Sequence, residues 1–211
     1  MKKSMKLAVA ALVALALVGL SSTAGAQYEG DSRAEASVTG GVHILNENDT
    51  ALPDQVVNVP LVATVGYRLT PMFTAEGEFT WIIPVTQTLD LGQGVSAERK
   101  SPDILAYQAN LRADLPVWSS GAPYVAAGLG ALTVLSNTDE DRFPQLEESE
   151  TMFALNFGAG LNWDLGSRWA LRGDFRELVA FPSDNANGLS DASGADPIWM
   201  ERVTAGLAYR F

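Results

Sequence analysis

The most constraining feature of the sequence is a strict two-residue alternation that continues to its last residue. The final segment, 203–211, carries Val, Ala, Leu, Tyr and Phe at odd positions and Thr, Gly, Ala and Arg at even positions. Because successive side chains of a β-strand point to opposite faces, this segment is expected to be a strand with one apolar and one polar face. Any half-buried edge strand has this pattern, so the rest of the chain decides what the strand belongs to.

Seven earlier segments alternate in the same way, and the closing strand is expected to begin near residue 198. The seven lie at 34–45, 57–69, 72–83, 105–115, 123–135, 153–164 and 169–180. Short connections near Pro71, Ser119 and Gly166 alternate with four long ones. Each segment has the roughly 9–11 residues that a tilted membrane strand needs. The pattern predicts an all-β, eight-stranded antiparallel up-and-down transmembrane β-barrel with both termini on the short-turn, periplasmic side.

The polar faces indicate an inside-out barrel, with apolar residues toward lipid and polar residues in the lumen. Segment 72–83 sets Glu76 and Glu78 opposite Phe73, Phe79 and Trp81, which a soluble core would not accommodate. A soluble lipocalin-like barrel would instead place its apolar residues inside. Aromatic residues also gather near the short turns, as interfacial girdles require. They are Tyr67, Phe73, Trp118, Trp163, Trp169, Tyr209 and Phe211.

Segment 123–135 is the ambiguous one, because glycine and alanine occupy both of its faces. The interpretation favoured from the sequence places its larger side chains on the outward, lipid-facing side. These outward residues are Tyr124, Ala126, Gly128, Leu132 and Val134.

The N-terminal residues have the pattern of a secretory signal peptide. Three lysines within the first six residues precede an apolar run over 7–20, and Ala24-Gly25-Ala26 forms a small-x-small cleavage site. The run is shorter than the roughly 20 residues of a transmembrane helix. We therefore expect residues 1–26 to be cleaved and residues 27–211 to form the barrel domain. Because the chain has no cysteine, lipid attachment and disulfide bonds are not expected.

The charge of the chain excludes one class of partner. The three early lysines are among 14 basic residues, so the mature chain would carry 11 basic and 25 acidic residues, a formal charge of −14. This sign is wrong for attracting phosphates, so no nucleic-acid partner is expected. After the signal segment no apolar run approaches helix-spanning length, and a closed sheet is the other structure that satisfies every backbone group in lipid.

The whole mature chain resembles the OmpA/OmpX-type family of eight-stranded outer-membrane β-barrels. The resemblance rests on Pro123–Gly130, on Trp169–Arg176 and on the ending Ala208-Tyr209-Arg210-Phe211. It implies a bacterial outer-membrane location in contact with lipid and lipopolysaccharide. It also implies that Tyr209 and Phe211 form the signal read by the barrel-assembly machinery, with periplasmic chaperones as transient partners. A monomer is expected, without the peptidoglycan-binding domain of some relatives.

Charged residues on the polar faces form the best candidate site, a luminal charge network. Its expected members are Glu76, Glu78, Arg112, Asp114, Arg172, Asp174, Arg176 and Arg202. Charges screened from water must be paired, so we expect Glu76 and Glu78 to pair with Arg112, and Arg172, Asp174 and Arg176 to pair with Arg202. The network would lock the lumen, or alternatively act as the gate of a narrow pore.

Catalytic and metal sites are not expected. His43 is the single histidine, and no serine or carboxylate is spaced to form a triad with it. One histidine without cysteine does not make an ordinary zinc site, and no cofactor motif is present. The segment 139–150 is acidic but lacks the spacing of an EF-hand. It is interpreted as a solvated loop, with shared divalent cations or an external partner as the alternative.

The expected function is therefore non-enzymatic: envelope integrity or surface interaction through the extracellular loops. A narrow, porin-like channel is the first alternative. An enzyme that modifies lipid A is the second.

Overall fold

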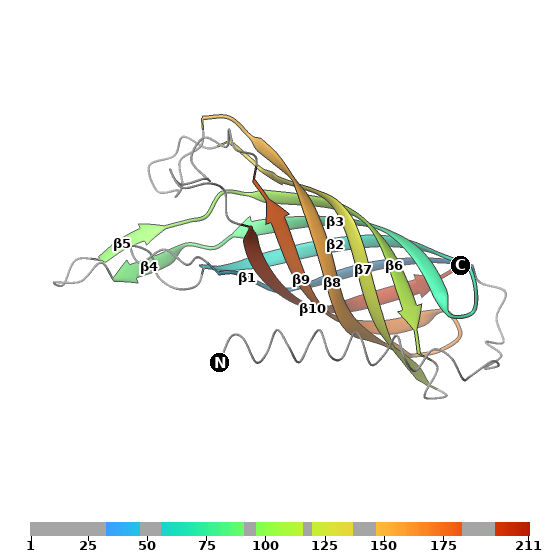
Figure 1. Ribbon diagram of the computed structural model, residues 1–211. Helices are drawn as coiled ribbons and strands as arrows, with labels where there is room; N and C mark the ends of the chain where they lie inside the picture. The colour runs from blue at the N-terminus through green and yellow to red at the C-terminus, as the bar shows by residue number, and fades with distance from the viewer. Residues whose placement is uncertain (1–32, 47–55, 91–95, 116–119, 137–146, 183–196) are drawn as a thin grey trace, which may run out of the picture.

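The computed structural model describes residues 33–46, 56–90, 96–115, 120–136, 147–182 and 197–211, and within them the protein is all-β. Eight strands form a closed barrel, drawn in Figure 1 as long ribbons inclined to the barrel axis. They are β1 (Ala34–Asn46), β2 (Val56–Arg68), β3 (Phe73–Pro84), β6 (Ile104–Asp114), β7 (Gly121–Val134), β8 (Glu150–Asp164), β9 (Trp169–Phe181) and β10 (Ile198–Arg210). The predicted fold class and strand number are confirmed.

Every strand pairs antiparallel with its neighbours, and β1 pairs with β10 to close the sheet. The closing ladder runs from Glu35 opposite Arg210 to Asn46 opposite Trp199. Beyond the ladder, the Phe211 amide donates to the Ala34 carbonyl oxygen at 3.0 Å. The closure leaves no free edge in the barrel, which a bilayer would not tolerate.

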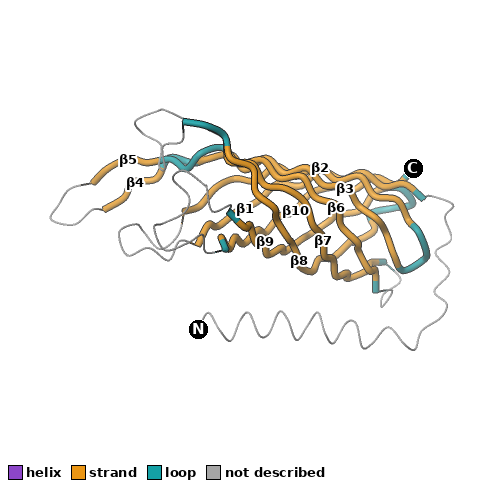
Figure 2. The backbone as a smooth tube through the Cα atoms, turned by 45° about the horizontal axis from the view of Figure 1, so that its top comes forward, coloured by secondary structure: helices purple, strands orange, loops and turns teal. Residues whose placement is uncertain are grey.

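The alternation in the sequence becomes an outward apolar face and an inward polar face. Val65 and Leu129 are 67% and 56% exposed on the outer wall, whereas Thr80 and Arg176 are fully buried inside. No helix in the described part of the chain has the length and apolar character to cross a membrane. Tight connections over 69–72 and 165–168 lie at the end of the barrel where β10 stops, marked C in Figure 2.

The connection after β3 is more structured than the sequence indicates. It was expected to be a long polar loop over 84–103, but it contains a separate antiparallel pair, β4 (Gln87–Asp90) and β5 (Ser96–Arg99). Figures 1 and 2 show this pair projecting beyond the barrel end opposite the C-terminus. The chain then returns to the barrel, where the buried Ser101 hydroxyl donates to Asn58 Oδ1 at 2.9 Å.

The predicted facing of β7 is wrong. Tyr124, Ala126, Leu132 and Val134 are buried in the lumen instead of facing outward, and Gly128 shares their face. The register explains this, because residues directly opposite one another in a ladder point to the same side. Tyr124 lies opposite Asp114, and the face of Asp114 is luminal.

One end of the lumen is apolar, which the sequence analysis did not anticipate. We call this group the apolar cap; it lies at the end with the long connections. The cap consists of Ile82, Ile104, Leu132, Val134, Met152, Ala154, Leu178, Ala180 and Met200, with Ile198 packed against it. The expectation that polar residues fill the whole lumen therefore fails at this end.

Several expectations fall outside the described residues. They are the signal peptide over 1–26, the position of Trp118, and the acidic residues between 139 and 142. Of the acidic third connection, Glu147 and Glu148 are described and are exposed.

Candidate functional site: the luminal ion network

Charged side chains from four strands meet inside the barrel between the short-turn end and its middle. We call this group the ion network. Its members are Glu35 of β1, Glu76 of β3, Arg112 and Asp114 of β6, and Arg172, Asp174 and Arg176 of β9. All are buried. The period-two pattern places them there, since each occupies a luminal position of its strand.

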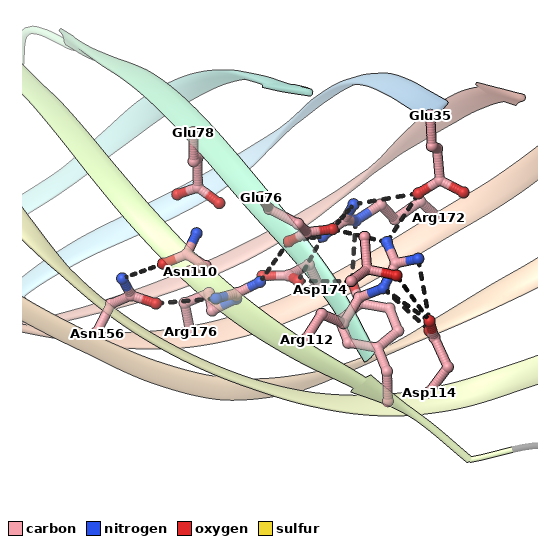
Figure 3. Close-up of polar contacts among 12 residues, drawn as sticks. Glu35, Glu76, Glu78, Asn110, Arg112, Asp114, Asn156, Arg172, Asp174 and Arg176 are labelled. Carbon is pink, nitrogen blue, oxygen red and sulfur yellow. Dashed lines mark hydrogen bonds and ion pairs between the residues drawn. The ribbon is translucent and has the colours of Figure 1, made fainter. Parts of the chain in front are cut away.

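Glu76 is the centre of the network (Figure 3). Its Oε1 lies 2.6 Å from Arg112 Nη1 and 2.9 Å from Arg172 Nη1. Its Oε2 accepts from Arg172 Nη2 at 3.1 Å and lies 3.7 Å from Arg176 Nη2. One carboxylate therefore holds three guanidinium groups from two strands.

The arginines are shared with further carboxylates, so each arginine of the network has at least two carboxylate partners. Arg112 Nη1 lies 2.7 Å from Glu35 Oε1, and Arg112 Nε lies 3.0 Å from Asp114 Oδ1. Arg176 Nε lies 2.9 Å from Asp174 Oδ1. Glu35 was not among the expected members of the network. Its position on the polar face of the first strand could have identified it as a luminal residue.

Tyr124 is the second residue that sequence reasoning missed. Its ring lies beside the guanidinium carbons of Arg112 and Arg172, at 5.4 and 5.1 Å from the ring centroid. Its hydroxyl donates to Asp174 Oδ2 at 2.6 Å and accepts from Arg172 Nε at 3.0 Å. The outward facing assumed for β7 concealed this role.

Toward the cap, Glu78 and Arg202 form a separate pair. Arg202 Nη1 lies 2.8 Å from Glu78 Oε1 and donates to Thr80 Oγ1 at 2.7 Å. The structure brings Glu76, but not Glu78, to the expected partner Arg112. Arg202 reaches the network through Asp174 at 3.8 Å.

At the short-turn end, Arg210 continues the pairing. Its Nη1 lies 2.7 Å from Asp164 Oδ1, and its Nε lies 3.3 Å from Glu35 Oε2. On the outer side of the same end, Tyr209 packs edge-on against Trp169 and Phe211, with centroids 4.8 and 5.1 Å apart. These contacts put Tyr209 and Phe211 in an aromatic cluster at the rim.

His43 lies in the lumen and is fully buried. It is opposite Asn58 on β2 and Arg202 on β10, and among the described residues neither of its ring nitrogens has a hydrogen-bond partner. No serine or carboxylate of the described strands forms the hydrogen bond to it that a triad would require. In the part of the chain that the structure describes, no three acidic or histidine side chains gather in a way that could hold a metal ion.

The outer wall carries one charged pair that sequence reasoning did not single out. Glu177 of β9 and Glu201 of β10 are direct partners in the ladder and occupy outward positions of the alternation, where Glu177 is only 5% exposed. Within the described strands, the remaining outward positions carry no charged residue. Like charges directly opposite each other destabilise a sheet.

Comparisons with known proteins agree with this geometry. A family model described as the outer membrane protein beta-barrel domain matches residues 11–211. The barrel of Neisserial surface protein A superposes with a TM-score of 0.57 at 12% identity, covering 84% of this chain and 97% of that one. The N-terminal barrel of Pseudomonas aeruginosa OprF gives 0.53 at 14% identity, covering 87% and 100%. No curated protein matches the sequence.

Proposed function

Because this chain belongs to the outer membrane protein beta-barrel family, we propose that it is a non-enzymatic, closed barrel of the bacterial outer membrane. It contributes to envelope integrity or surface interaction through its long connections, and its lumen does not conduct solutes. The observation that carries this proposal is the ion network, in which Glu76 and three arginines occupy the interior.

Barrel size supports the closed lumen. Eight strands enclose an interior just wide enough for side chains to fill. In this chain, Arg112 and Arg172 extend into that interior, and both lie against the ring of Tyr124. Opening a channel through the lumen would require several charge-assisted hydrogen bonds to break at once.

The proposed partners follow from the surfaces. The apolar wall would contact membrane lipid, and the acidic third connection would meet lipopolysaccharide at the cell surface. The rim residues Tyr209 and Phe211 would be the signal for the assembly machinery, and the barrel would act as a monomer.

Planar-bilayer recordings test the closed lumen. The purified, refolded barrel is expected to give no conductance steps under conditions in which an open porin does. Regular steps from the wild-type protein would overturn the proposal and favour the narrow channel, the second candidate. That candidate is supported by the uncharged polar residues that share the lumen with Glu76, including Asn110 and Asn156, joined at 2.7 Å.

Two cell-based measurements test the remaining parts of the proposal. Deleting the gene is expected to increase sensitivity to detergents, and the full chain should restore resistance. Expression is expected to leave the mass spectrum of lipid A unchanged, and a new lipid A species would support the enzymatic alternative instead.

A further inference from the structure

We propose that a hydrated polar layer lies between the ion network and the apolar cap, so that the lumen is shut by two barriers in series. The inference rests on the proposed closed barrel and deepens it. It assigns water as the ligand of the layer, and it predicts that opening either barrier alone does not open the lumen.

The layer consists of His43, Asn58, Gln108 and Arg202. His43 is opposite Asn58 on one side and Arg202 on the other, and Gln108 is opposite Glu78, the ion partner of Arg202. All four residues are at most 5% exposed. The layer therefore brings four strands together inside the barrel.

Its place between the barriers follows from the strand positions. On β10, Met200 of the cap and Arg202 are consecutive luminal residues. On β6, Ile104 of the cap, Gln108 and Arg112 of the ion network follow one another along the same luminal face. Gln108 and Arg202 thus have the cap on one side and the network on the other. His43 and Asn58 continue the layer on β1 and β2, the two strands that contribute no residue to the cap.

Unpartnered polar atoms identify the ligand. Among the described residues, both ring nitrogens of His43, Nδ2 of Asn58, Nε2 and Oε1 of Gln108 and Nε of Arg202 are buried without a hydrogen-bond partner. Buried polar groups are seldom left in this condition, and internal water is the usual partner.

The chemistry of these atoms favours water over an ion. Amide and guanidinium N–H groups donate, whereas Gln108 Oε1 and one nitrogen of a neutral His43 accept. Water satisfies both kinds of group, and a single ion satisfies one kind. The charge of Arg202 is already paired with Glu78 at 2.8 Å, so no net charge calls for a counter-ion.

The apolar cap makes a barrier independent of the ion network. It draws side chains from β3, β6, β7, β8, β9 and β10, and Ile82, Leu178 and Met200 are at most 1% exposed. An apolar constriction excludes hydrated ions by dewetting, without any ion pair to break. The ion network excludes them by filling the lumen with paired side chains.

Planar-bilayer conductance of four proteins tests the series arrangement. They are the wild type, Arg172→Ala in the network, Leu132→Ser with Met200→Ser in the cap, and the three substitutions combined. The combined variant is expected to pass at least tenfold more current than either partial variant, which should stay near the wild-type level. A matched control, Leu129→Ser with Leu207→Ser, changes the outward faces of the same two strands and should remain closed.

Conduction by either partial variant at the level of the combined one would overturn the proposal, and so would a combined variant that folds and stays closed. Conduction by the wild type would instead contradict the proposed function. Heat-modifiable migration on gels establishes that each variant is folded.

Water-edited solid-state NMR on the wild-type barrel in lipid tests the layer without any substitution. The side-chain amides of Asn58 and Gln108 should receive magnetisation from water, whereas the Leu178 methyl groups in the cap should not. Dry amides at both residues would overturn the proposal even if the variants do not fold.

Discussion

At the scale of single residues, Glu76 is expected to stabilise the barrel strongly, because its carboxylate contacts three arginines. Glu76→Gln removes the charge that holds Arg112 and Arg172, leaving guanidinium groups that are buried with less compensation. Removing one partner of a buried ion pair costs about 3–5 kcal/mol. We therefore expect a lower urea midpoint for the refolded barrel in lipid vesicles. The exposed Glu148→Gln is the control, and an equal midpoint for the two variants would show that the network does not stabilise the fold.

Gly160 has a steric role that a substitution can isolate. A Cβ atom at this position would overlap the ring and hydroxyl of Tyr124. Gly160→Ala is therefore expected to displace Tyr124 from Asp174 and to destabilise the barrel by about 1–3 kcal/mol, the usual cost of overpacking. Gly166→Ala is the matched control, because nothing lies within 4 Å of its added Cβ. Equal urea midpoints for the two alanine variants would contradict the packing.

Some luminal residues could be identified from the sequence and others were missed, because assigning a residue to the luminal side does not always require the same information. Glu76, Arg112 and Arg172 lie in segments whose two faces differ clearly, so their luminal position is readable from alternation alone. Tyr124 lies among small residues that occupy both faces, and its side is set by the register with Asp114. Register depends on how a strand pairs with its neighbour, and the alternation within one segment carries no information about that pairing.

At the scale of strands, β9 and β10 place Glu177 and Glu201 directly opposite each other. Glu201→Gln removes the like-charge contact with Glu177 and should stabilise the barrel by about 0.2–1 kcal/mol. The urea midpoint of the refolded variant in vesicles gives this difference. Glu148→Gln, which neutralises an exposed glutamate outside the barrel strands, controls for the general effect of removing one negative charge. A lowered midpoint for Glu201→Gln alone would show that the carboxylate makes a favourable contact.

The strand ends also explain why the apolar cap was not predicted. Leu178, Val179 and Ala180 follow one another at the end of β9, so both faces are apolar and alternation ceases there. A sequence pattern of this kind does not distinguish a lumen-filling leucine from a lipid-facing one. The β4–β5 pair was missed for a similar reason, because its four-residue strands are too short to establish a period.

At the scale of the whole molecule, the number of strands and the closure of the barrel could be predicted from the sequence. Both depend on the number of alternating segments and on the lengths of the connections between them. Eight alternating segments and the strict succession of short and long connections allow few topologies, and the closed antiparallel barrel is the one observed. The contents of the lumen depend on distances between strands that are far apart in sequence. Arg172 and Glu76, for example, are separated by 96 positions.

The orientation of the barrel in the membrane gives a prediction for the whole molecule. The short-turn end, with the C-terminus, is expected to face the periplasm, and the long connections the cell exterior. The chain has no cysteine, so single cysteines at Glu148 and Gly166 report on opposite ends without background. A membrane-impermeant maleimide should label Glu148→Cys on intact cells, whereas Gly166→Cys should react only after the outer membrane is permeabilised. Labelling of Gly166→Cys on intact cells, with Glu148→Cys protected, would reverse the assignment, since both positions lie in open surroundings.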